Sequence, residues 1–224
     1  MEEFKNLIYA PLDFGFDEDF FKEMNNKIEN KIEKNEFCFL NKEKVSGKNG
    51  VFSIPIIGFD VPSENEEHNF KKLMEVNEFR LFFRTLENNF FIRIVKMNLA
   101  YLTFGSLYYH NDLIKSIKEI NDYLIRNDPC SVKVNLDPIT EKSYSLFLKR
   151  NKKELQAFRP SHIKSYLCTD VLAEHGVQTY TDEKMKTLMI CGITNNNRFK
   201  QKINEMEHKY KDYFIYTSDF DRKE

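Results

Sequence analysis

The chain has 224 residues and a formal net charge of −1, from 34 Lys and Arg against 35 Asp and Glu. Hydrophobic residues make up 41% of it, with 21 Phe, 11 Tyr and no Trp, which supplies a core and excludes a wholly disordered chain. The near-neutral charge argues against nucleic acid as a partner, because nucleic-acid-binding domains are usually clearly basic.

The cysteine spacing and the first residues of the sequence indicate the cellular compartment in which we expect the protein. Cys38, Cys130, Cys168 and Cys191 are far apart and form no CxxC pair. The first residues lack a basic segment followed by an apolar one, and no apolar run approaches the roughly 18–20 residues of a membrane span. We therefore expect a cytoplasmic protein with reduced thiols and no membrane association.

The N-terminal part mixes helices with short strands. Residues 4–12 (FKNLIYAPL) predict a strand, and residues 13–35 place apolar side chains at helical spacing. The apolar segment 52–62 contains two prolines, which suits an edge strand. Residues 68–88 predict a second amphipathic helix.

From residue 90 the pattern is mainly of β type. Residues 111–128 have a helical period, and 197–213 predict a terminal helix before a last strand at 214–219. Between them, apolar segments recur at intervals typical of an antiparallel sandwich or barrel. These segments are 131–138, 143–150, 163–173, 176–181 and 186–193.

We interpret the chain as one α+β domain, because no Gly-, Ser- or Pro-rich linker divides it. Its parts are a mixed helical region, a β-rich core and a C-terminal helix with a strand, at 1–89, 90–193 and 194–224. An α/β fold with repeated strand–helix–strand units is the alternative, from the segments 7–40, 99–136 and 187–217.

One set of residues has the composition of a metal site. In a strand, His110 and Asp112 point to the same face because side chains alternate. His175 can join them from a neighbouring strand, and two imidazoles with one carboxylate hold non-haem Fe(II) while leaving positions open. Lys184 or Lys186 supplies a cation for the carboxylate of an acid cosubstrate.

The stretch from Arg93 to Cys191 resembles the double-stranded β-helix (jelly-roll) core of Fe(II)/2-oxoglutarate-dependent oxygenases. It is most similar to the aspartyl/asparaginyl β-hydroxylase-like branch. The similar segments are RIVKMNLAYLTFGSLYYHND, SVKVNLDP and SHIKSYLCTDVLAEHGVQTYTDEKMKTLMICGI. The resemblance implies a jelly-roll core with N-terminal and C-terminal helices.

The resemblance also implies roles for the site residues. His110, Asp112 and His175 would be the catalytic iron ligands. Lys186, or else Lys184, would replace the family's Arg in holding the 2-oxoglutarate cosubstrate, although a Lys lacks the bidentate fork of an Arg. The implied activity is hydroxylation of a C–H bond in an amino acid, a peptide or a small metabolite.

Two alternatives stay open. Asp112 also stands where it could cap the helix predicted at 111–128, which would occupy its carboxylate with backbone N–H groups. If the metal site is a coincidence, the chain is a non-catalytic intracellular binding protein, such as an immunity-type or nucleic-acid accessory factor.

Overall fold

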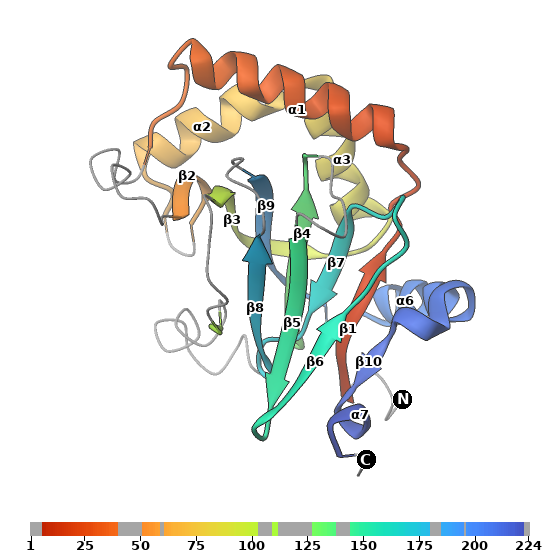
Figure 1. The fold of residues 1–224 in the computed structure, drawn as a ribbon. Coiled ribbons are helices and arrows are strands. Elements are labelled where there is room, and N and C mark those ends of the chain that lie inside the picture. The colour runs from red at the N-terminus through yellow and green to blue at the C-terminus, as the bar shows by residue number, and fades with distance from the viewer. Residues whose placement is uncertain are drawn as a thin grey trace.

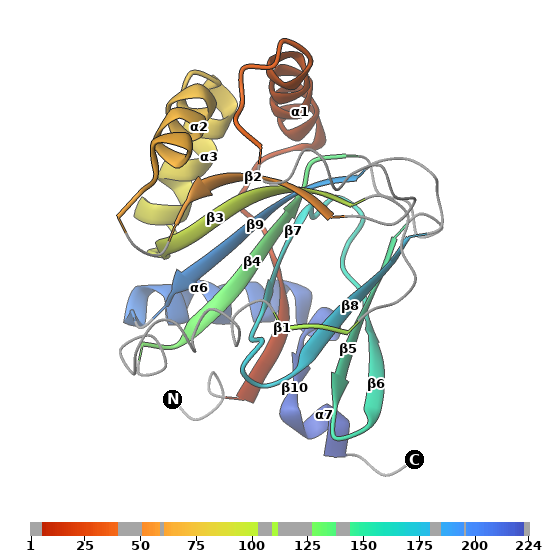
Figure 2. The same cartoon turned by 90° about the vertical axis from the view of Figure 1, so that its left-hand side faces the viewer.

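The fold is built on two antiparallel sheets that face each other (Figures 1 and 2). The structure is a computed structural model, and it describes residues 6–39, 51–58, 61–102, 109–111, 127–137, 144–179, 185–194 and 196–221. The large sheet contains, in spatial order, β10 (Ile215–Tyr216), β1 (Leu7–Leu12), β7 (Ser165–Cys168), β4 (Pro129–Asn135), β9 (Met185–Ile193), β3 (Arg93–Leu102) and β2 (Val51–Ile57). The small sheet contains β6 (Lys153–Ala157), β5 (Tyr144–Arg150) and β8 (Glu174–Thr179).

Helices cover the face of the large sheet that points away from the small one (Figure 2). They are α1 (Glu18–Glu33), α2 (Glu64–Met74) and α3 (Asn77–Asn88), and α6 (Asn197–Tyr210) joins the same apolar core beside β1. Most of the buried Phe side chains lie between these helices and the sheet. The N-terminal helices thus buttress the large sheet.

The first predicted helix forms because its apolar positions share one face. Phe21, Met24 and Ile28 of α1 are buried at helical spacing. The Asp17 carboxylate caps the helix by accepting a 2.8 Å hydrogen bond from the Phe20 N–H. The predicted strand and helix near the N-terminus are confirmed as β1 and α1, and β2 lies at the sheet edge that its prolines indicated.

The single helix predicted at 68–88 is wrong, because the chain breaks it into α2 and α3. Ser63 begins α2 with a capping box to Glu66. Val76 has extended backbone angles (φ −79°, ψ 114°), and its side chain is buried in the core. Burial of this β-branched residue favours the break over a continuous helical period.

The chain passes back and forth between the sheets. After β3 in the large sheet, residues 109–111 lie beside β8 of the small sheet, where His110 and His175 form a bridge. The order then runs β4 (large), β5 and β6 (small), β7 (large), β8 (small) and β9 (large). All of the described strand pairs are antiparallel, so the α/β alternative with parallel repeats is wrong.

The remaining elements complete the comparison with the sequence. The terminal helix is confirmed as α6 and a short 3-10 helix (Lys211–Tyr213), and the last strand is reduced to β10 before α7 (Thr217–Asp221). The helix predicted at 111–128 lies almost wholly outside the described residues. Among the helices that the structure describes, none is long and apolar enough to cross a membrane.

Asn69 of α2 holds three separate segments together, and its loss should destabilise the fold. Its wholly buried amide accepts from the Cys38 N–H (2.8 Å) and donates to the carbonyls of Cys38 (2.8 Å) and Pro55 (2.7 Å). We expect Asn69→Ala to lower the free energy of unfolding by about 2–4 kcal/mol, because it leaves buried backbone groups unpaired. Urea denaturation measures this loss.

The neighbouring exposed His68 provides the control for Asn69. Its ring contacts the Glu36 carbonyl at 2.8 Å from the surface of α2. We expect His68→Ala to cost about 1 kcal/mol or less. An equal cost for both variants would contradict a tethering role of Asn69.

Candidate functional site

Two histidines that lie far apart in the sequence are direct neighbours across two strands. The His110 N–H donates to the His175 carbonyl at 2.9 Å, and the His175 N–H donates to the His110 carbonyl at 3.0 Å. Directly opposed residues present their side chains on the same face of a sheet. The two rings accordingly lie together, with centroids 4.3 Å apart.

This pair faces the interior between the two sheets. His175 is opposite Leu148 of β5, whose side chain belongs to the apolar cluster between the sheets. The His175 side chain is fully buried. Tyr109 contacts Lys149, which is adjacent to Leu148 and so points to the opposite face of β5; the Lys149 ammonium lies 5.0 Å from the Tyr109 ring centroid.

Both ring nitrogens of His175 have a polar partner. Nδ1 lies 2.9 Å from Oδ1 of Asp170, and Nε2 is in contact with the ammonium of Lys133 on β4. A carboxylate accepts and an ammonium donates, so these partners favour the proton on Nδ1 and a lone pair on Nε2. Nε2 therefore presents its lone pair toward the large sheet.

Asp170 also connects the two histidine segments. Besides holding His175 through its carboxylate, its backbone carbonyl accepts a hydrogen bond from the side-chain amide of Asn111, next to His110. Asp170 is almost completely buried in the turn between β7 and β8. One residue thus fixes the orientation of His175 and the position of the 110–111 segment.

Lys186, which the sequence suggested as a cosubstrate anchor, lies on the other face of the large sheet. Its ammonium is 2.7 Å from Glu29 of α1 and 3.2 Å from Asp137. Burial lowers the pKa of Lys186, but these two carboxylates outweigh burial and the net pKa is raised. The structure does not bring Lys186 to the histidine pair.

Lys133 is a buried cation on the face of the large sheet that points toward the histidine pair. It alternates along β4 with the apolar residues Val132 and Val134, which pack under the helices. Its neighbours on the inner face, Ser131 and Asn135, are also buried. The sequence signal was the alternation SVKVN in a strand, which by itself is equally typical of a solvated polar face.

The inner face continues into a small hollow next to Lys133. It measures about 80 Å³ and is lined by Lys96, Asn98, Ser131, Met189 and Cys191 from three adjacent strands of the large sheet. Ser131 is two residues from Lys133 on β4, so both side chains share this face. The lining thus contains a cation, an amide and a hydroxyl.

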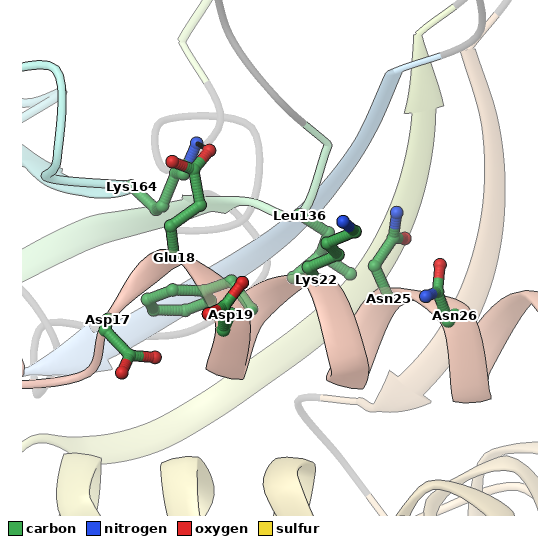
Figure 3. Close-up of a pocket in the computed structure, with 9 residues that line it drawn as sticks. Asp17, Glu18, Asp19, Lys22, Asn25, Asn26, Leu136 and Lys164 are labelled. Atoms are coloured by element: carbon green, nitrogen blue, oxygen red, sulfur yellow. Dashed lines mark hydrogen bonds and ion pairs between the residues drawn. The ribbon is translucent and has the colours of Figure 1, made fainter.

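A larger groove lies on the outer side, along the N-terminal half of α1 (Figure 3). It measures about 580 Å³ and is lined mainly by acidic and amide side chains. The ammonium of Lys164 in this groove is 2.9 Å from the Glu18 carboxylate. Since α1 covers the helix side of the sheet, this groove is separate from the histidine pair (Figure 2).

The donor set near the histidines is suitable for a metal but incomplete in what the structure describes. An imidazole nitrogen holds a first-row metal at about 2.1 Å, so rings 4.3 Å apart are close enough to share one ion. Within the described residues, no group of three His, Cys, Asp or Glu side chains forms a metal site. Asp112 and Lys184 lie outside the described residues, so the ligand role of Asp112 stays a prediction.

Comparison with known proteins leaves the family open at the level of sequence. No protein-family model matches the chain, and no curated protein matches it.

Several solved structures are similar in fold. A prolyl-4-hydroxylase from Pseudomonas putida is 11% identical with a TM-score of 0.49, covering 85% of this chain and 94% of that one. A 2-oxoglutarate-Fe(II) oxygenase family oxidoreductase from Burkholderia pseudomallei is 10% identical with a TM-score of 0.46, covering 77% and 82%. A prolyl hydroxylase from Trichoplax adhaerens, in complex with a peptide of a hypoxia inducible factor, is 14% identical with a TM-score of 0.49, covering 86% of each chain.

These three are described as prolyl hydroxylases or as a 2-oxoglutarate-Fe(II) oxygenase, and none as an aspartyl/asparaginyl β-hydroxylase. Identities of 10–14% and TM-scores below 0.5 do not establish a shared family.

Proposed function

We propose that the chain is an Fe(II)/2-oxoglutarate-dependent oxygenase that hydroxylates a C–H bond of an amino acid, a peptide or a small metabolite. The observation that carries the proposal is the cross-strand pair of His110 and His175 between the sheets, with Nε2 of His175 directed inward by its partners. Asp112 would complete the iron site.

The order of the strands supports a jelly-roll core. Jelly rolls bury their interior between two antiparallel sheets that together contain eight strands. In this chain, the segment from β3 to β9 passes repeatedly between the large and small sheets, with 109–111 beside β8 and with β5 and β6 as consecutive strands of the small sheet. This arrangement brings the segment of His110 next to the strand of His175, although 64 residues separate them (from 111 to 174).

The residue types would suit the group that they are proposed to hold. His110, His175 and Asp112 would bind Fe(II) through nitrogen and oxygen, the ligand types that suit non-haem iron. The Lys133 contact already places a cation on Nε2 of His175. Lys133, rather than Lys186, would then pair with the carboxylate of 2-oxoglutarate that is not on the metal.

The chain's own contribution is positioning and exclusion of water. Iron with 2-oxoglutarate, when bound, supplies the oxidation of a substrate C–H bond by dioxygen. Asp170 keeps the proton of His175 on Nδ1, and the sheets exclude solvent from His175 and Lys133, which are 0% and 4% exposed. The hollow beside Ser131 would accept the polar end of a small acid or amide.

Binding of Fe(II) and 2-oxoglutarate tests the proposal directly. Under anaerobic conditions, we expect addition of both to the protein to produce a weak visible charge-transfer band. His110→Ala and His175→Ala should abolish the band, because each removes an iron ligand. His208→Ala, on the exposed face of α6, is the matched control and should keep it. A wild-type chain without the band, at millimolar concentrations of both components, contradicts the proposal.

Substitution of Asp112 separates its two predicted roles. If Asp112 is an iron ligand, Asp112→Ala should lose the charge-transfer band with little change in thermal stability. If Asp112 caps a helix, the band should persist and the free energy of unfolding should fall by about 1 kcal/mol. Spectroscopic titration together with thermal unfolding distinguishes the two.

Asp170→Asn should weaken metal binding without removing a ligand. An Asn amide can donate to Nδ1 and move the ring proton to Nε2, where it blocks coordination. We expect Fe(II) affinity to fall about 10–100-fold, as is usual when a carboxylate behind a ligating histidine is lost. Isothermal titration under anaerobic conditions measures this, and unchanged affinity would show that Asp170 has only a packing role.

A further inference from the structure

We infer that Lys133 is an internal competitor for the metal, so that binding of the acid cosubstrate and binding of the metal are coupled through this one side chain. The inference rests on the proposed function. The contact of the Lys133 ammonium with Nε2 of His175 carries it.

A single lone pair is the basis of the competition. With Nδ1 of His175 held by the Asp170 carboxylate, Nε2 has one lone pair in the ring plane. A metal ion would use that lone pair at about 2.1 Å, and the Lys133 ammonium uses it as a hydrogen-bond acceptor. Both cations cannot occupy it at once, so metal binding requires Lys133 to leave.

The position that Lys133 moves to must also compensate its charge. An ammonium in a buried site needs a polar or anionic partner, because burial without one is costly. On the sheet, its cross-strand neighbours are Tyr166 and Met189, and its neighbours along β4 on the same face are Ser131 and Asn135, all uncharged. The carboxylate of a bound 2-oxo acid is a stronger partner than any of these four.

Coupling of the two ligands follows from this exchange. A ligand that pairs with Lys133 draws the ammonium away from His175 and so frees Nε2 for the metal. By linkage, the metal raises the affinity for the acid by the same factor. Without such a ligand, the Lys133 ammonium would stay on the lone pair of Nε2.

Mn(II) binding to the full chain tests the coupling without turnover. We would measure the Mn(II) Kd from the EPR signal of free Mn(II), with and without saturating 2-oxoglutarate. The proteins to be compared are the wild type and the variants Lys133→Met, Lys133→Gln and Lys186→Met. Lys186 is the matched control, because it is a buried lysine on the adjacent strand but on the opposite face. Thermal unfolding of each variant confirms that it is folded.

We expect Lys133→Met to bind Mn(II) alone about tenfold more tightly than the wild type, because one cation repels another at this distance. Lys133→Gln should also bind more tightly, and Lys186→Met should stay within about twofold of the wild type. Saturating 2-oxoglutarate should tighten Mn(II) binding more in the wild type than in either Lys133 variant. Mn(II) binding by Lys133→Met when the wild type binds none supports the inference equally.

Three results would overturn the inference, and they differ in what they imply for the proposed function. Equal or weaker Mn(II) binding by both folded Lys133 variants overturns the competition and leaves the oxygenase proposal intact. A similar gain in Lys186→Met reduces the effect to general charge and also overturns it. Absence of Mn(II) binding in all four proteins overturns both.

Discussion

In the middle of the large sheet, β4 is buried on both faces, although it alternates apolar and polar side chains. Its apolar residues pack under the helices, while Ser131, Lys133 and Asn135 are enclosed between the sheets. Enclosed polar groups must find partners, because unpaired ones are costly. Asn135 accepts from the Thr187 hydroxyl at 3.0 Å, and Lys133 contacts His175. The site is thus a consequence of covering a two-faced strand on both sides.

The sequence predicted the types of residue in the site better than their positions. The ligand chemistry of imidazole predicts His110 and His175 as partners, and the strand pairing brings them together. Sequence patterns alone do not single out Asp170 or Lys133, because one lies in a turn and the other in an ordinary alternating strand. Their contacts with His175 depend on which sheet covers them, and local sequence patterns contain no information about that.

The fold was predictable where one face of an element is apolar and the turn residues are typical. The fold was less predictable where tertiary packing determines where an element begins or ends. The strand β6 was missed because the turn before it uses Asn151 and Lys152, with φ of 51° and 68°, instead of glycine. The break between α2 and α3 was missed because Val76 continues the apolar pattern while leaving the helix.

The two lysines of the core show why counting along the chain is not enough to assign a site. Lys186 follows His175 by eleven residues in the sequence. Strand alternation nevertheless puts it with Leu188 and Ile190 on the helix side. There it pairs with Glu29 and fastens α1 to the end of the sheet. A shift of one residue moves a strand side chain to the other face of the sheet. The spacing from a histidine therefore predicts an anchor only when the face to which the residue points is also known. Lys133 comes before His175 in the sequence. Its position in β4 puts its side chain on the face opposite to that of Lys186, and its ammonium contacts the His175 ring.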